Sequence, residues 1–259
     1  MVFVKRKFFF IYINEIWFAN NFSFFSLFKV SRYLRCKDKK FKFGFFRDTF
    51  STIIIKLDQS LDSIFNNFNS TTRNEIRRVE KDSTILFKTS NDLNLFYGFY
   101  NKFAKSKKNL SQFNGIYLLN KNDIMIVTIA AFQFNKEEPD EPMVMHLYLI
   151  DYEEKRAVLL NSASLFRYKE FSHLKNKIGM ANRFLHFRDM LYFRSLGLSK
   201  YDFGGYAINT NDTEKKQINF FKQSFGGEII TEYDYSSFLF FLAKQIQKLL
   251  KYVKLSFLN

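Results

Sequence analysis

Apolar and polar positions alternate along the chain in two different periods, which predicts a fold that contains both strands and helices. The run FSTIIIKL, residues 50–57, has the β-branched composition of a buried strand. Asp58 follows it and predicts the N-cap of a helix over 58–68. A second helix is expected to begin at one of three neighbouring hydroxyl residues, namely Ser70, Thr71 or Thr72.

A strand and a helix follow this pair. The segment 84–90, TILFKTS, is typical of a strand, and Asp92 after it predicts the start of a helix that reaches about Ser106. Apolar residues recur in that helix at helical spacing, which predicts that one face enters the core. They are Leu93, Phe96, Tyr97, Tyr100 and Phe103.

The middle of the chain is extended. The segments 115–119, 123–134 and 142–151 are joined by an Asn-Lys-Asn turn at 120–122 and by an acidic turn that contains proline. They predict an antiparallel meander, and the segment 156–166 predicts a further strand.

The last third returns to alternating elements. A helix over 176–196 is expected to stop at Gly197, and a strand follows at 200–205. A helix over 213–225 and a strand over 228–238 complete the pattern. The order predicts an α/β domain with a mixed central sheet flanked by helices.

Residues 1–48 are aromatic and basic without a clean period, which favours one or two strands and a loop packed on the main domain. Residues 5–7 and the apolar run after them imitate a signal peptide, but Asn14 and Glu15 interrupt that run, so β-structure is favoured over a membrane segment. The expected organisation is a β-rich N-terminal extension over 1–48, a main domain over 49–237 and a basic amphipathic helix over 238–259.

That last helix has two interpretations. It can lie on an anionic membrane, or it can cover the protein's own core with its lysines in water. The basic face consists of Lys244, Lys248 and Lys251, and the apolar face of Leu242, Ile246, Leu249, Leu250 and Val253.

Composition bounds the function. The formal net charge of +15 suits phosphate-bearing partners such as tRNA, nucleotide-linked sugars, coenzyme A or anionic lipid, although drift in an AT-rich coding sequence produces the same excess of lysine. The single cysteine, Cys36, has no partner for an intrachain disulfide, and no Cys/His cluster has zinc-ligand spacing. These features predict a cytoplasmic protein without a metal site.

Several features of the sequence are candidates for binding or chemistry, and each has a plain structural alternative. Residues 176–181 place Gly179 near a helix N-terminus that can hold phosphate or can be an ordinary helix start. Asp202 ends a strand at the side of the sheet where ligands bind, or it is a structural carboxylate that bonds loop amides.

A cationic ridge is expected on the second helix. Arg73, Arg77 and Lys81 recur at intervals of four residues and line one face, where they can bind an anion or pair with Glu75 and Glu80 in water.

Taken together, the C-terminal strings resemble the GNAT acyltransferase superfamily, and in particular its Fem branch of aminoacyltransferases that add amino acids to peptidoglycan precursors, here in a single-domain form. The matching strings are Ala181-Asn182-Arg183, Gly197, Tyr201-Asp202-Phe203-Gly204-Gly205, Phe221-Lys222 and Phe225-Gly226-Gly227, with 72–78 resembling the branch's Arg-rich helix. The resemblance covers about residues 49 to 235.

The resemblance implies a transferase whose activated acyl donor lies between two splayed strands that frame Gly179. It implies Lys222 and Phe221 as the pair that handles the donor and stabilises the tetrahedral intermediate, with Asp202 beside them. The donor site would comprise Asn176, Lys177, Gly179, Ala181 and Arg183. The acceptor site would comprise Ser162, Ser164, Gly204, Gly205, Tyr206, Arg73 and Arg77.

The expected reaction is direct attack by an amine or hydroxyl of a nucleotide- or lipid-linked glycan precursor, without a covalent enzyme intermediate. Acyl-CoA or aminoacyl-tRNA would serve as co-substrate, with no permanently bound cofactor. The base that takes the proton is left open among Asp202, His186 and Asp189. The alternative is a non-catalytic module that binds tRNA or anionic lipid on the same fold, and the oligomeric state is not predicted.

Overall fold

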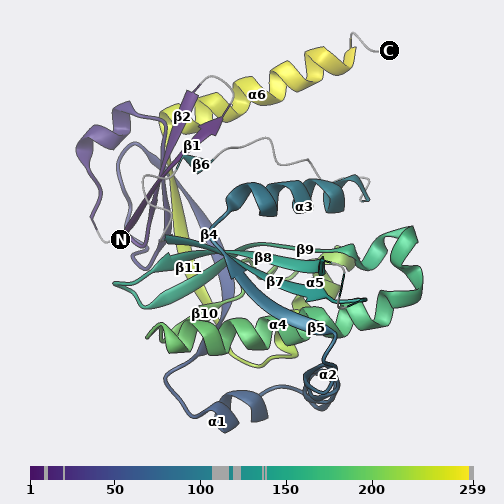
Figure 1. The fold of residues 1–259 in the computed structure, drawn as a ribbon. Coiled ribbons are helices and arrows are strands. Elements are labelled where there is room, and N and C mark those ends of the chain that lie inside the picture. The colour runs from purple at the N-terminus through teal and green to yellow at the C-terminus, as the bar shows by residue number, and fades with distance from the viewer. Residues whose placement is uncertain are drawn as a thin grey trace. The chain divides into compact units, whose positions relative to one another are not determined.

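Strands and helices of the chain are distributed over two units in the computed structural model (Figure 1), which describes residues 1–8, 11–19, 21–106, 117–118, 124–135, 137 and 139–256. Unit 1 is formed by Met1–Ser51, Gly115–Asn120 and Thr231–Asn259. Unit 2 is formed by Thr52–Asn114 and Lys121–Ile230, and it contains every residue expected at the donor and acceptor sites.

A mixed sheet forms the centre of unit 2. Its neighbouring strands are antiparallel except for one parallel pair, β9 with β10. The order is β5 (Ile85–Ser90), β7 (Met125–Phe132), β8 (Glu141–Asp151), β9 (Arg156–Ser164), β10 (Lys200–Asp202) and β4 (Phe45–Lys56). The predicted α/β architecture with a mixed sheet is therefore confirmed.

Helices lie on both faces of this sheet. In Figure 1, α3 lies on one face and α4 on the other, and α2 packs against α4. The helices are α1 (Leu61–Asn66), α2 (Ser70–Glu80), α3 (Leu93–Lys105), α4 (Lys175–Ser195) and α5 (Thr213–Gln223), with two short 3-10 helices, η3 (Leu165–Arg167) and η4 (Lys169–Leu174). Of the five residues predicted for the inner face of α3, Phe96 and Tyr100 are buried.

The helix caps show which local rules operate. Asp92 caps α3 as predicted, since its carboxylate accepts from the backbone N–H of Asn94. The cap of α1 is Ser60 and not Asp58, because the Ser60 hydroxyl accepts from the N–H of Ser63 at 3.1 Å.

The predicted cap of α2 was also wrong. Asn69, and not Ser70, Thr71 or Thr72, fills that position, because its side-chain oxygen accepts from the N–H of Thr72 at 2.8 Å. The side-chain amide of asparagine thus fills the position that was assigned to a hydroxyl residue.

The predicted meander is shifted by one strand. Strand β6 (Tyr117–Leu118), the described part of the segment 115–119, pairs with β1 (Val2–Phe8) and not with β7. The meander therefore consists of β7, β8 and β9. The expected turn at 120–122 lies outside the described residues.

The strands of unit 1 lie in the order β11 (Glu228–Ser237), β3 (Ser31–Cys36), β2 (Ile11–Trp17), β1 (Val2–Phe8) and β6, and β2 and β3 are parallel. The first 48 residues thus contribute more than the one or two strands predicted. The sequence concealed this because Glu15, which interrupts the apolar run, is buried and pairs with Arg6 at 3.0 Å across β1 and β2.

The described helices include α6 (Phe238–Ser256), although its side chains are described only as far as residue 247, so most of its predicted basic face lies outside the description. Within the described part of the chain, none of the helices has the combination of length and apolarity that a membrane span requires. Cys36 is buried beside Tyr33 and Tyr235, and burial raises the pKa of its thiol to about 12.

Candidate functional site

Lys222 on α5 lies against the loop that follows β10. Its ammonium group donates to the carbonyl oxygen of Gly204 and, at 2.6 Å, to that of Gly205. The predicted catalytic lysine and the predicted glycine pair therefore meet, although 17 residues separate Lys222 from Gly205 in the sequence.

Further contacts hold the same loop to α5. The Asn219 side chain donates to the carbonyl of Ala207 at 2.8 Å and accepts from its N–H at 3.1 Å. Gln223 donates to the hydroxyl of Tyr206 at 2.9 Å. One face of α5 thus fixes the backbone of the loop, which places the lysine in a preorganised setting.

Burial alters the charge of this lysine. Desolvation lowers the pKa of Lys222 from 10.5 to about 8, and the negative charge of Asp202 partly opposes the shift. The ammonium form therefore predominates at pH 7, and it is lost as the pH rises above about 8.

The loop can take this path only with glycine at position 204. Gly204 has φ of +60°, and a Cβ atom there would collide with the carbonyl oxygen of Leu159 on β9.

Gly204→Ala is accordingly expected to lower the free energy of unfolding by about 1–3 kcal/mol, the usual cost of a strained backbone position, or more if Leu159 cannot move. Urea unfolding monitored by circular dichroism measures the change. Gly98→Ala is the matched control, because Gly98 lies in α3 with no atom within 4 Å of its added Cβ, and it should not destabilise the fold. Equal stabilities of the Gly204 variant and the wild type would contradict the structure of the loop.

Asp202 is completely buried, and both of its carboxylate oxygens accept hydrogen bonds. One carboxylate oxygen accepts from the hydroxyl of Thr52 and, at 2.7 Å, from the N–H of Gly204. The other accepts twice from the Arg156 guanidinium, at 3.0 and 2.5 Å. These contacts correspond to the structural alternative for Asp202, in which the carboxylate bonds a loop amide.

A chain of hydrogen bonds runs through the buried interior beside this site. It joins α4, β8 and β10, and the distances along it are 2.6 Å from Asp189 Oδ2 to Tyr148, 2.6 Å from Tyr148 to Tyr201, and 2.6 Å from Tyr201 to His186 Nδ1. His146 also bonds Asp189 Oδ2, at 2.8 Å.

The direction of each hydrogen bond in this network follows from the carboxylate of Asp189 at one end. The Tyr148 hydroxyl donates its one proton to Asp189 Oδ2. Tyr201 must then donate to Tyr148, and His186 Nδ1–H must donate to Tyr201. Burial raises the pKa of both tyrosines well above the usual range, so each phenol keeps its proton.

His186 is therefore held as one tautomer. Burial, followed by the charges of His146, Lys222 and Arg183, lowers the pKa of His186 well below its usual value, so the ring is neutral. With the proton on Nδ1, the Nε2 atom carries a lone pair, and it has no hydrogen bond among the described residues. The ring packs against Phe221, with the two ring centroids 5.5 Å apart.

This tautomer can be observed directly. We expect proton–nitrogen correlation spectra of the wild type to show a protonated Nδ1 and an unprotonated Nε2 at His186, unchanged from about pH 6 to 8. The Tyr201→Phe variant lacks the hydroxyl that accepts from Nδ1–H, so the population of the tautomer protonated on Nε2 should increase. Exposed His173 is the internal reference for free exchange between tautomers. A wild-type His186 protonated on Nε2 would refute the proposed order.

The same region contains the candidate metal ligands found among the described residues, namely His146, His186 and Asp189, whose ligand atoms lie within 4.8 Å of one another. His146 Nδ1 and Asp189 Oδ2 are 2.8 Å apart, closer than the separation of about 3.4 Å between two ligands of a tetrahedral zinc ion. Their geometry is that of a direct hydrogen bond.

The predicted donor residues are spread along the first half of α4. Two of them are engaged in ion pairs, Lys177 with Asp82 at 2.7 Å and Arg183 with Glu75 at 3.0 Å. The Arg183 guanidinium also lies 5.0 Å from the centre of the Phe221 ring.

The start of α4 differs from the expectation. The helix does not follow β9 directly, because η3 and η4 intervene, and Leu174 at the N-cap supplies no side-chain cap. Asn176 is exposed in the first turn, Gly179 faces the ring of Phe166, and Ala181 is buried.

The predicted acceptor residues fall into two groups. Ser162 and Ser164 are half-buried on β9, and Ser162 lies directly opposite His146 in the sheet. Arg73 donates to the carbonyls of Asn66 and Phe68, so it holds the turn between α1 and α2. Arg77 lies 5.2 Å from the centre of the Phe65 ring on α1.

The buried hydrogen-bond network contains two residues that the sequence did not single out, His146 and Tyr148. A signal was present. Two polar residues spaced by two, at 146 and 148, point to the same face of an otherwise apolar strand, and residues 182, 186 and 189 recur at helical spacing. The partner of Asp202, Arg156, had no comparable signal because it opens a strand next to a turn.

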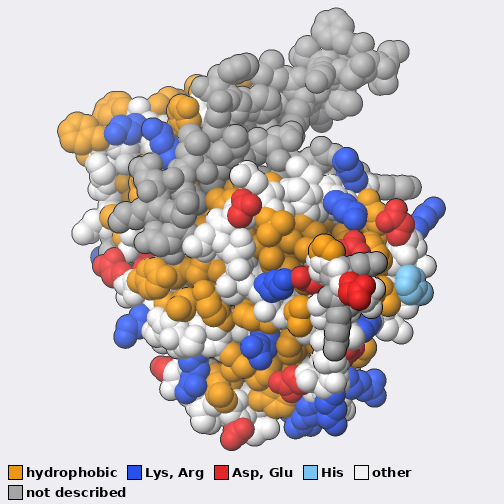
Figure 2. Space-filling view, in the orientation of Figure 1, with side chains coloured by type: hydrophobic (Ala, Val, Ile, Leu, Met, Phe, Trp, Pro, Cys, Tyr) orange, Lys and Arg blue, Asp and Glu red, His pale blue; other side chains and the backbone are white. Residues whose placement is uncertain are grey.

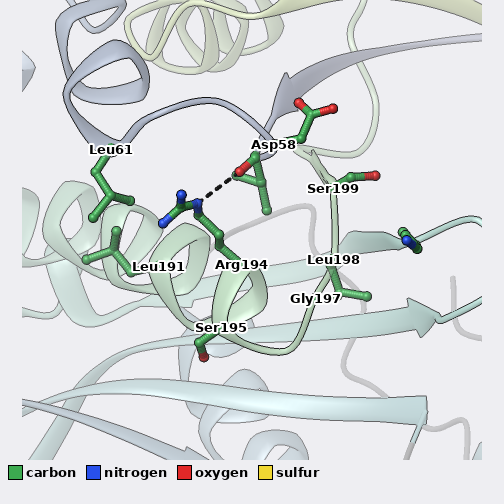
Figure 3. Close-up of a pocket in the computed structure, with 10 residues that line it drawn as sticks. Asp58, Leu61, Leu191, Arg194, Ser195, Gly197, Leu198 and Ser199 are labelled. Carbon is green, nitrogen blue, oxygen red and sulfur yellow. Dashed lines mark hydrogen bonds between the residues drawn. The ribbon is translucent and has the colours of Figure 1, made fainter.

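A surface pocket of about 500 Å³ lies at the opposite end of α4, between that helix and the residues after β4 (Figure 3). Arg194 in its wall donates to the carbonyl of Leu57 at 3.1 Å. None of the predicted donor or acceptor residues lines it.

Comparison with known proteins bears on the fold. FemX is similar over 94% of this chain and 85% of its own, with a TM-score of 0.60 and 13% sequence identity. The chain shares its fold with FemX. No family model and no curated protein matches the sequence.

Two further solved structures have TM-scores of 0.48, a likeness too distant to support an argument. One is the C-terminal domain of a putative lysylphosphatidylglycerol synthetase from Agrobacterium fabrum, at 9% identity over 80% of this chain and 67% of its own. The other is L-PGS from Bacillus licheniformis, at 11% identity over 79% and 67%.

Proposed function

We propose that the protein is an acyltransferase of the Fem type, with residues 49–237 as its catalytic domain. It transfers an acyl or aminoacyl group from acyl-CoA or aminoacyl-tRNA to an amine or hydroxyl of a nucleotide- or lipid-linked glycan precursor, in the cytoplasm. The observation that carries the proposal is the partly desolvated Lys222 ammonium, fixed over the loop 204–205 in a fold shared with FemX.

The donor is proposed to enter between β9 and β10. The two strands pair only at residues 156–158 of β9, and β9 continues to Ser164 beyond the end of β10 at Asp202. Backbone groups of β9 beyond the end of this pairing would then be available to a substrate chain. Arg183 and Phe221 lie at the side of α4 and α5 that would receive the donor, and the serines of β9 would receive the acceptor.

In the proposed reaction the acceptor amine attacks the donor carbonyl, and the carbon–oxygen double bond becomes an oxyanion. The Lys222 ammonium donates two of its three N–H groups to loop carbonyls, and we propose that the third donates to the developing oxyanion. Collapse of the intermediate breaks the bond to the leaving group, and the thiolate of coenzyme A or the ribose alkoxide of tRNA takes up the proton that the amine has given to the base.

Of the three candidate bases, we propose His186 for the proton lost by the amine. The Asp202 carboxylate accepts four hydrogen bonds, and the Asp189 carboxylate accepts from Tyr148 at the end of the buried hydrogen-bond network. We therefore propose that both are positioning residues. His186 offers an unused lone pair. Because the ring is only 1% exposed, the Phe221 ring beside it must turn aside for the amine to reach it.

The experiment that tests the function supplies the purified protein with acyl-CoA mixtures and, separately, with aminoacyl-tRNA, together with glycan precursors. Mass spectrometry then asks which donor is consumed and which acceptor gains the group. The proposal fails if neither donor is consumed while tRNA or anionic lipid is bound in a salt-sensitive manner, since that result identifies a non-catalytic binding module.

A further inference from the structure

A set of exposed phenylalanines in unit 1 is not used by the proposed reaction. Their exposed fractions range from 67% to 81%, far above the usual value for this residue, and we call them the phenylalanine surface. Three lie in or at the edge of η1 (Phe24–Phe28), and two lie in the loop between β3 and β4: Phe24, Phe25, Phe28, Phe41 and Phe43.

The two segments that carry this surface lie side by side. A Cβ atom added at Gly44 would collide with the side chain of Leu27 in η1. Lys42 lies 5.0 Å from the centre of the Phe22 ring, which itself stacks on Tyr33 with ring centroids 3.9 Å apart. The two segments that carry the exposed rings are therefore neighbours.

The platform under the exposed rings is ordered by hydrogen bonds. The Tyr33 hydroxyl bonds the hydroxyl of Ser26 at 2.9 Å and accepts from the N–H of Ser23 at 2.9 Å. The Tyr235 hydroxyl donates to the carbonyls of Asp38 and Lys40 at 2.7 and 2.8 Å. The fold thus presents the rings outward from a fixed base.

The same stretch is strongly basic. Residues 21–47 contain eight lysines and arginines and one acidic residue, Asp38. Arg32 and Arg35 lie near the carboxylate of Asp234. Three lysines, Lys29 after η1 and Lys39 and Lys40 in the loop, are exposed. Figure 2 shows blue and orange side chains together at the upper left, over the purple segment that follows β2 in Figure 1.

We propose that the phenylalanine surface docks on a lipid bilayer that carries anionic headgroups. Aromatic rings on a short exposed turn can enter the boundary between headgroups and acyl chains, while lysines around them contact the phosphates. A second copy of this chain fits poorly, because two surfaces with a large excess of positive charge would face each other. Complementary charge therefore favours the membrane.

Flotation with lipid vesicles tests the proposal without donor or acceptor, so its outcome is independent of the transfer reaction. We expect the full chain to float with vesicles of phosphatidylcholine and phosphatidylglycerol, and much less with phosphatidylcholine alone. Replacing Phe24, Phe25 and Phe28 together by serine should lower partitioning by at least about tenfold. Lys39→Glu with Lys40→Glu should lower it by about fivefold or more for each lysine.

Matched controls come from unit 2. Phe134→Ser removes a phenylalanine that is 56% exposed, and Lys216→Glu reverses an exposed lysine of α5; both should bind vesicles like the wild type. Circular dichroism confirms folding of each variant. The proposal is overturned if the serine variant floats like the wild type, if neutral and anionic vesicles bind equally, or if sedimentation shows a dimer that the serine variant abolishes.

Discussion

Lys222→Ala should lower kcat/KM for acyl transfer by about 100- to 1,000-fold, the loss usually seen when one group that stabilises an oxyanion is removed. The reason is that the ammonium is partly withdrawn from water and fixed by two carbonyl groups, so its charge is weakly screened and needs no reorganisation. Folding should persist, because a buried charge is removed and not created. Initial rates with whichever donor the consumption experiment identifies, together with thermal unfolding, measure both effects.

Two variants of α5 separate catalysis from support of the loop. Lys216→Ala removes an exposed lysine of the same helix and should leave the rate unchanged. Asn219→Ala breaks the contacts to Ala207 but keeps the cation, so it should cost much less than Lys222→Ala. Equal losses in the Asn219 and Lys222 variants would show that the lysine acts only by holding the loop.

The pH dependence gives a second signature of Lys222. Because its native pKa is about 8, the wild-type rate should contain a step that falls as the pH rises above 8, and this step should be absent from Lys222→Ala. The lysine also affects stability. Its unfolded pKa of 10.5 is higher, so the native state loses the proton first, and the cost of burying the charge is relieved between pH 8 and 10.5.

Local rules predicted the elements of the fold better than their partners. Asp92 and Gly197 mark helix ends as expected, since a cap depends on residues within one turn. Strand β6 was assigned to the wrong neighbour, because a two-residue strand carries no register information of its own. The strands of the first 48 residues were underestimated because a buried ion pair looks polar in sequence.

The candidate site, like the fold, was predicted only in part. The contact of Lys222 with Gly204 joins two strings that the sequence had singled out, so the resemblance alone placed them in one site. The hydrogen-bond chain from Asp189 to His186 joins three elements and depends on hydroxyl directions that no spacing encodes. Its two tyrosines resembled ordinary core positions, because tyrosine is common in buried strands.

Arg156→Met is expected to have the largest effect on stability, a loss of about 3–5 kcal/mol in the free energy of unfolding. The substitution keeps the volume of the side chain but leaves the Asp202 carboxylate buried without its cation, and Arg156 is itself only 2% exposed. Thr52 and the Gly204 N–H remain as donors, which do not balance a full charge. Chemical denaturation followed by far-ultraviolet circular dichroism gives the value.

The double variant Arg156→Met, Asp202→Asn decides what this pair contributes. Asparagine removes the buried charge but keeps an oxygen for Thr52 and Gly204, so much of the lost stability should return. If Asp202 is a positioning residue, the folded double variant should also retain transfer, because Lys222 and His186 are unchanged. A double variant that folds as well as the wild type but has no transfer activity would instead indicate that Asp202 acts as the base in the reaction.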